Sequence, residues 1–205
     1  EYVDGVFQVK GDPEKSQPLG AVAFEAFTAH NLPDGVEPTL SAEATIDPQD
    51  FSYPHGTHLA AMEVDTETGK VTVRKYVCVD DVGVQVNPMI VEGQVHGGVA
   101  QGIAQALYEG ANYDEDGQPQ NANLSTYLIP SAPDLPSFIT DITCTPSTTN
   151  PLGTKGVGEA GAIASTPAII NGIVDAIRHL GVNDVLMPAT PMTVWKTIQA
   201  AQGGK

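Results

Sequence analysis

The chain has 205 residues and a formal net charge of -16, with most of the acidic excess within residues 1–81. Its hydrophobic content of 41% is typical of a globular protein, and so acidic a surface repels nucleic-acid phosphates and anionic lipid. No run of 18 apolar residues and no signal-peptide pattern is present, so we expect no nucleic-acid partner, no membrane span and a cytoplasmic location.

The first 50 residues carry five prolines and little periodicity, and we expect a linker with a partial helix over 19–30, belonging to a larger chain. The rest, residues 51–205, is expected to form one domain. Segments 57–64 and 71–79 read as the strands of an antiparallel hairpin, because turn residues fill 65–70. The valines at 71, 73, 77 and 79 predict one half-buried face.

A helix is predicted over residues 91–110, because four apolar residues recur at steps of four: Val95, Val99, Ile103 and Leu107. Its four glycines each cost roughly 0.5–1 kcal/mol relative to alanine. They are Gly93, Gly97, Gly98 and Gly102. Such a loss indicates close contact with another backbone or with a flat ligand.

The remaining segments complete an α+β fold. A second hairpin is expected around the turn at 113–117, and a strand around 137–144. Thr166-Pro167 predicts a helix start, and Gly181 predicts where that helix ends. Thr190-Pro191 predicts the start of a final helix that contains Val194, Trp195 and Ile198.

A lone carboxylate stands among glycines in the segment Gly153-Thr-Lys-Gly-Val-Gly-Glu-Ala-Gly161. Small neighbours cannot shield Glu159, and the backbone there can approach a ligand closely. A positioned general base needs such a setting. The alternative is a glycine-rich turn whose glutamate interacts with the first turn of its own helix.

Three spaced motifs extend this pattern. Lys155-Gly-Val-Gly-Glu-Ala-Gly161, with Met187-Pro-Ala-Thr-Pro-Met-Thr-Val-Trp195 after it, resembles the C-terminal part of the molybdenum hydroxylase large subunit. Asn87-Pro-Met-Ile-Val-Glu-Gly-Gln-Val-His-Gly-Gly-Val-Ala-Gln-Gly102 is similar to the loop and helix by which this family binds molybdopterin. Phe51-Ser-Tyr-Pro-His-Gly56 resembles its carbon monoxide dehydrogenase branch. The family also includes xanthine dehydrogenase and aldehyde oxidoreductase, and its motifs occur here in the family's order.

The resemblance implies roles for individual residues. Glu159 corresponds to the glutamate beside the molybdenum, which is held to act as a base. Gln101 corresponds to a glutamine that contacts molybdopterin, with a solvated helix residue as the alternative. Lys155 is expected either to neutralise a cofactor pyrophosphate or to lie exposed. The other implied cofactor-binding residues are Gln94, Gly97, Gly98, Gly156, Val157 and Gly158.

For the complete enzyme, the resemblance implies molybdopterin cytosine dinucleotide with molybdenum, and in one branch copper held by residues outside this chain. Electrons would pass to [2Fe–2S] clusters and FAD on partner subunits. The implied partners are the remainder of the large subunit, an iron–sulfur small subunit and an FAD-binding medium subunit. The substrate would be carbon monoxide, an aldehyde or an N-heterocycle, with water as oxygen source, and the isolated fragment would be inactive.

Other interpretations remain. A non-catalytic binding or assembly module with this fold is one, and a hydrolase with Glu159 as base is another, although no second carboxylate stands near it in sequence. We expect no metal site within the chain. His55 and His58 are three apart in an extended segment and so face opposite ways. These two and His96 are each expected to be a buried or surface histidine whose hydrogen bonds are satisfied. Cys78 and Cys144 are expected as small apolar residues, with one disulfide as the alternative.

Overall fold

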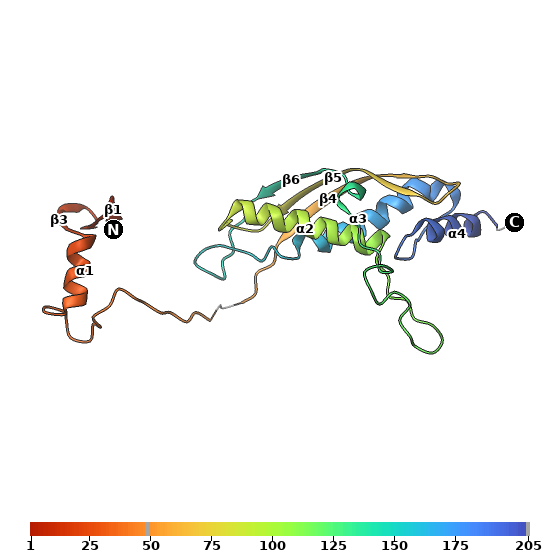
Figure 1. Cartoon of the computed structure of the whole chain (residues 1–205). Helices are drawn as coiled ribbons and strands as arrows, with labels where there is room; N and C mark the ends of the chain where they lie inside the picture. Colours follow the sequence, from red (N-terminus) through yellow and green to blue (C-terminus); the bar gives the residue numbers. More distant parts are fainter. Residues whose placement is uncertain (48–49, 204–205) are drawn as a thin grey trace. The chain divides into compact units, whose positions relative to one another are not determined.

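The computed structural model describes residues 1–47 and 50–203, in two compact units, Glu1–Asp47 and Pro48–Lys205 (Figure 1). In the first unit an antiparallel sheet of order β1-β2-β3 precedes a helix. Its elements are β1 (Tyr2–Val3), β2 (Val6–Val9), β3 (Asp12–Pro18) and α1 (Leu19–Thr28). The helix was predicted, but the strands replace the expected linker. Their side chains are almost all exposed or half-exposed, so no buried face imposes an alternating pattern on the sequence.

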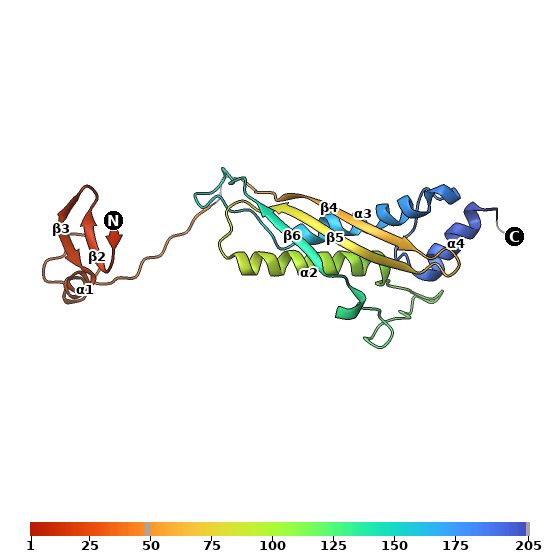
Figure 2. The same ribbon diagram turned by 90° about the horizontal axis from the view of Figure 1, so that it is seen from above.

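The second unit places a three-stranded sheet of order β4-β5-β6 against two long helices, and Figures 1 and 2 show the helices along one face of the sheet. The predicted hairpin is confirmed as an antiparallel pair, whereas the third strand runs parallel to β5. The elements are β4 (His55–Val64), β5 (Val71–Asp81), α2 (Pro88–Leu107), the 3₁₀ turns Ala132–Asp134 and Arg178–Leu180, β6 (Phe138–Thr143), α3 (Ala160–Ile177) and α4 (Pro191–Ala201).

An irregularity in the hairpin changes which side of β5 is buried. Ala61 pairs with Lys75 and Met62 with Val73, so Arg74 is an extra residue in β5. Val71 and Val73 pack on the core before it, but Tyr76 and Cys78 do so after it. The prediction of one face through all four valines is therefore wrong, because one inserted residue moves the following side chains to the opposite face.

The stripe predicted on α2 is confirmed, since Val95, Val99, Ile103 and Leu107 are all buried. Two glycines, Gly98 on α2 and Gly161 in the first turn of α3, each lie against the backbone of the other helix. A Cβ on Gly98 would come within 2.9 Å of the Ala162 nitrogen, and one on Gly161 within 2.5 Å of the Val95 oxygen. The two helices thus pack closer than larger residues permit.

The start of α3 differs from the prediction. The helix begins at Ala160, and Pro167 lies inside it. The Thr166 hydroxyl lies 3.3 Å from the Gly102 oxygen and 3.0 Å from Gln105 Oε1, so it joins α3 to α2 rather than starting a helix. The predicted end is confirmed, because Gly181 has a left-handed φ of 89°.

The segment Ala160–Leu180 is long and apolar enough to cross a membrane by length and composition. Its inner side carries Ile169, Ile173 and Ile177, each at most 1% exposed, within the core between the sheet and α2. This burial gives the apolar composition a role in packing the domain.

Of the two remaining predictions, the final helix is confirmed and the second hairpin is not. Thr190 accepts a hydrogen bond from the Thr193 nitrogen and begins α4, as expected, and Val194 and Ile198 are buried while Trp195 is exposed. The expected second hairpin is wrong, because a single bridge between Tyr113 and Pro119 stands in its place. Polar residues fill that segment, so it has no apolar face to pair against the core.

Candidate functional site

Glu159 stands at the first position before α3, where the chain leaves the glycine-rich loop. Its side chain is exposed and makes no capping hydrogen bond, while its backbone carbonyl accepts from the Ile163 nitrogen at 3.0 Å. The alternative of a glutamate that caps its own helix is therefore not what the structure shows. The carboxylate is free to meet a partner from outside its own helix.

The loop before Glu159 is fixed to the end of β5 by the backbone. The Val84 nitrogen donates to the Gly153 oxygen at 2.9 Å, and the Lys155 nitrogen donates to the Val82 oxygen at 3.0 Å. These bonds flank an antiparallel bridge between Gly83 and Thr154. Gly83 has a positive φ of 65°, and a Cβ there would come within 2.3 Å of the Gly153 oxygen, so this close approach requires glycine.

A buried ion pair strengthens the same junction. Lys155 Nζ lies 2.9 Å from Asp81 Oδ1, and the two side chains are 10% and 2% exposed. Asp81 also accepts from the Gly83 nitrogen and lies 3.3 Å from the Thr143 hydroxyl. The hydrogen bond from Lys155 holds the pKa of the Asp81 carboxyl well below its usual range. Lys155 is not exposed, which excludes one of the two placements expected for it.

The N-terminal turns of α3 lie beside the middle of α2, and the two helices run in the same direction. A Cβ on Gly158 would come within 3.6 Å of Gln94 Nε2, Gly98 faces Gly161, and Gly102 faces Ser165. The Gln94 amide therefore neighbours the loop that carries Glu159.

Gln101 follows Gln94 by seven residues, or about two turns, on the same side of α2. Its side chain is exposed, as is that of Glu159, and no hydrogen bond joins the two within the described ranges 1–47 and 50–203. The two helices place both groups on neighbouring elements without direct contact.

The remaining predicted residues divide into two groups. Gly97, Gly156 and Gly158 are exposed, and a Cβ on Gly97 or Gly156 would meet nothing within 4 Å. Gly98 is buried against α3, and Val157 packs on the apolar core. Gly98 and Val157 thus support the site from behind and do not line its open side.

Uncharged side-chain amides next to exposed glycines, which have no side chain to cover the backbone, suit a bulky polar ligand such as a pterin. Gln94 and Gln101 offer both donors and acceptors, and the open glycines leave room for a flat ring system at the backbone. By contrast, a cavity of ≈ 300 Å³ on the other side of α2 is lined by Glu92 and Asp141, which repel phosphate. The residues present fit molybdopterin at the glycine side of α2.

Comparison with known proteins identifies the family of the chain. Residues 1–136 match the model of the molybdopterin cofactor-binding domain. The chain belongs to that family. The fold inferred from the sequence motifs, a molybdopterin-binding domain of a molybdenum hydroxylase large subunit, is confirmed.

This molybdopterin-binding domain is 39% identical over 193 residues to the carbon monoxide dehydrogenase large chain of Hydrogenophaga pseudoflava, covering 94% of the chain and 24% of that relative. It is 38% identical over 203 residues to the 6-hydroxypseudooxynicotine dehydrogenase complex subunit gamma of Paenarthrobacter nicotinovorans, with 97% and 25% covered. The chain thus spans about a quarter of the length of the relatives it matches.

Solved structures give the same result. The Cu,Mo-CO dehydrogenase in its carbon monoxide reduced state superposes with a TM-score of 0.90 at 35% identity, covering 100% of this chain and 25% of that one. Quinoline 2-oxidoreductase from Pseudomonas putida 86 gives 0.90 at 39% identity, covering 97% and 25%. The molybdopterin-binding domain therefore shares its fold with enzymes whose names indicate different substrates.

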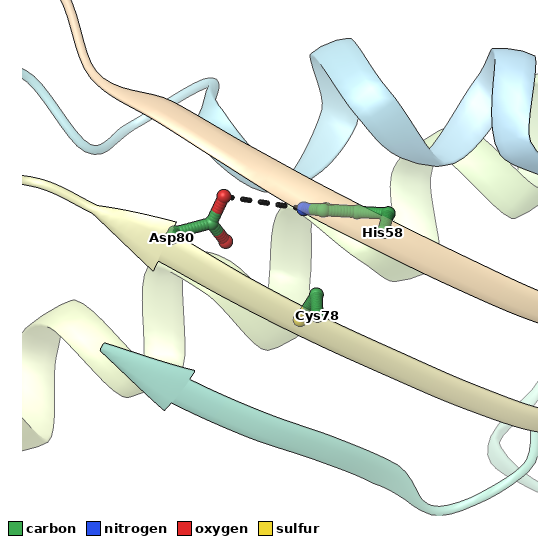
Figure 3. Close-up of side chains that lie close together, drawn as sticks. All are labelled: His58, Cys78 and Asp80. Carbon is green, nitrogen blue, oxygen red and sulfur yellow. Dashed lines mark hydrogen bonds and ion pairs between the residues drawn. The ribbon is translucent and has the colours of Figure 1, made fainter. Parts of the chain in front are cut away.

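One polar cluster was not foreseen from the sequence. His58 Nδ1 lies 2.8 Å from the Tyr76 hydroxyl. His58 Nε2 lies 3.2 Å from Asp80 Oδ1, and Figure 3 shows these two side chains with Cys78. Cys78 lies beside them, and burial with the nearby Asp80 carboxylate raises the pKa of its thiol to about 11. Hydrogen bonds satisfy His58, as expected, and His96, which lies 3.2 Å from the Thr140 hydroxyl. Cys78 and Cys144 are both unpaired, so the alternative of a disulfide is not what the structure shows, and Cys78 is buried as expected whereas Cys144 is exposed.

Proposed function

We propose that this chain forms the C-terminal molybdopterin-binding part of the large subunit of a molybdenum hydroxylase. The enzyme would oxidise carbon monoxide, an aldehyde or an N-heterocycle, with water as oxygen source. The observation that carries this proposal is the exposed, uncapped carboxylate of Glu159, whose preceding residue Gly158 neighbours the Gln94 amide of α2, in a chain of this family.

The bound molybdenum cofactor would supply the two-electron oxidation of the substrate carbon. Glu159 would accept a proton at its carboxylate as water oxygen is transferred to that carbon. Its exposed side chain has no capping bond to break before it can do so. A positioned general base of this kind contributes about 10²–10⁴ in rate.

The neighbouring residues would hold the cofactor. The amides of Gln94 and Gln101 would donate and accept hydrogen bonds at the polar edges of the cofactor rings. These edges are uncharged, so an uncharged amide suits them better than a carboxylate or an ammonium group. Gly97, Gly156 and Gly158 would let its rings approach the backbone. Gly98 and Val157 would keep α2 and the loop in place behind it.

Lys155 is assigned a different part in this proposal. Its ammonium is already bound by the buried Asp81 carboxylate, so a cofactor pyrophosphate would have to compete with an internal anion. Lys155 would therefore act mainly by fixing the loop that presents Glu159, with any effect on the cofactor being long-range attraction.

We further propose that the cofactor is the cytosine dinucleotide form of molybdopterin, in a cytoplasmic complex. Electrons would leave through [2Fe–2S] clusters on a small subunit to FAD on a medium subunit. Support comes from relatives named as large chain, large subunit or subunit gamma of a complex. A copper ion, if the enzyme uses one, would be held by the remainder of the large subunit.

The test is Glu159→Gln in the intact enzyme that contains this chain. We expect bound molybdenum to be retained and turnover to fall by at least about 100-fold, since the amide cannot accept the proton. Glu92→Gln, an exposed acid on α2 outside the glycine side, is the matched control and should keep its turnover. Near-normal turnover of Glu159→Gln would reject the assigned base and favour a non-catalytic module.

A further inference from the structure

Three metal-ligating side chains meet in the interior of the second unit. His58 projects from β4, and Cys78 and Asp80 project from β5 on the side of the sheet that faces α3 (Figure 3). His58 and Cys78 are directly paired across the hairpin, and Asp80 lies two residues further along the same face. Their ligand atoms all lie within 4.8 Å of one another.

The cluster is almost completely removed from solvent. The side chains of His58 and Asp80 are 1% and 3% exposed, and Cys78 is 1% exposed. Asp80 Oδ1 meets His58, but Asp80 Oδ2 is buried and has no hydrogen-bond partner among the residues that the structure describes. A buried carboxylate oxygen without a partner is costly, so a further group is expected to lie against it.

The cavity next to Asp80 provides room for such a group. It has a volume of ≈ 100 Å³ and lies between the start of β4 and the first turns of α3. Asp80 forms part of its wall, together with His55 and Gly56. A cation that reached Asp80 through this cavity would keep space for one bound water.

The donor set is selective. An imidazole nitrogen, a thiolate sulfur and a carboxylate oxygen are the ligands that zinc takes in proteins, at about 2.0–2.3 Å. Three protein ligands with an open fourth position form a common zinc arrangement. Calcium and magnesium prefer oxygen ligands, so the sulfur of Cys78 disfavours them.

An outer partner already orients the histidine. His58 Nδ1 lies 2.8 Å from the Tyr76 hydroxyl, which leaves Nε2 directed toward Asp80. Histidines that bind metals typically engage their second ring nitrogen in this way. The edge-to-face contact of the two rings, with centroids 5.7 Å apart, fixes the imidazole further.

We propose that His58, Cys78 and Asp80 form a binding site for one divalent zinc-type ion, with water from the adjoining cavity as fourth ligand. Binding would replace the His58–Asp80 hydrogen bond by two coordinate bonds and draw the sulfur inward by a side-chain rotation. The thiol proton would be released to solvent, so the ion would gain two anionic ligands and neutralise them. Glu159 and Gln101 take no part in this site.

The test uses the 205-residue chain after removal of metals with a chelator. Equilibrium dialysis against zinc is expected to give one bound ion per chain. Cobalt at the same site should show a thiolate-to-cobalt charge-transfer band in the near ultraviolet. Cys78→Ser should abolish that band and weaken zinc binding by more than about tenfold. Cys144→Ser removes the exposed cysteine and should leave the band and the stoichiometry unchanged.

A second variant guards against misfolding of the first. Tyr76→Phe keeps the buried ring but removes the outer hydrogen-bond partner, and it should weaken zinc binding by roughly 10–100-fold with the band retained. If the unmodified chain binds no zinc, the proposal is overturned, and a buried water molecule would be the partner of Asp80 instead. Binding that survives Cys78→Ser unchanged, or a band lost in Cys144→Ser, would overturn it as well.

Discussion

Lys155 and Asp81 form a nearly buried ion pair that joins the glycine-rich loop to the end of β5. Their charged atoms lie 2.9 Å apart, although the residues are 74 positions apart in the chain. Glu159 follows Lys155 by only four residues, and backbone bonds at Gly153 and Lys155 hold the same segment. The pair therefore fixes where the proposed base begins its helix.

Replacing either member of the Lys155–Asp81 ion pair is expected to lower turnover to the same extent. In the intact enzyme, Asp81→Asn and Lys155→Met should each lower turnover by about 10²-fold, because displacement of a catalytic group by about 1 Å has that cost. The double variant should be no worse than the poorer single one, since both remove one interaction. Turnover and molybdenum content measured on all three check this. Loss of cofactor from Lys155→Met alone would show that Lys155 binds the cofactor directly.

The same pair predicts a pH dependence of stability. The folded pKa of Asp81 lies below the unfolded value of about 3.9, so the unfolded chain binds the proton more readily. The stabilisation is complete above about pH 4 and is lost as the pH falls from there toward the lower folded value. Chemical unfolding of the chain and of Asp81→Asn should give a constant difference near neutral pH that shrinks below about pH 4. A difference that grows on acidification would contradict this assignment.

Local patterns predicted the elements whose packing is regular. The stripe from Val95 to Leu107 gave α2, and Thr190 with Pro191 gave the start of α4, because helix periodicity and capping are encoded within a few residues. The phase of β5 was not predictable, since nothing in the sequence marks Arg74 as an inserted residue. The strands before residue 19 were not predicted, because none of their faces is buried and the sequence there therefore shows no alternation of apolar and polar residues.

The candidate site was predictable only in part and for the same reason. Motif resemblance proposed Glu159, Gln94 and Gln101 as site residues, and two adjacent helices set their surroundings. It did not reveal that Lys155 meets Asp81, or that His58 meets Asp80, because each contact joins residues far apart in the chain. Long-range pairing of strands decides these neighbours, and one sequence does not report it.

The close packing of α2 on α3 gives a prediction about glycines. Gly161→Ala should lower the free energy of unfolding by about 1–3 kcal/mol, because its Cβ would come within 2.5 Å of the Val95 oxygen. Gly93→Ala, on the same helix pair but with nothing within 4 Å, should raise it by roughly 0.5–1 kcal/mol through helix propensity. Denaturant unfolding of both variants measures the contrast. Equal effects would contradict the packing described for the two helices.

A substitution at Gly97 distinguishes an effect on folding from an effect on cofactor binding. It is exposed on α2, and a Cβ there would meet nothing within 4 Å, so a larger helix-forming residue is compatible with the fold. Gly97→Leu should therefore leave the unfolding free energy of the chain unchanged or slightly higher.

In the intact enzyme the leucine would occupy the space proposed for the pterin. An overpacking penalty of about 1–3 kcal/mol corresponds to cofactor affinity lowered by about 5–150-fold. Molybdenum content after dialysis measures this, with Gly93→Ala as the control. Full cofactor occupancy in Gly97→Leu would show that the cofactor lies elsewhere, because the fold itself offers no obstacle to the substitution.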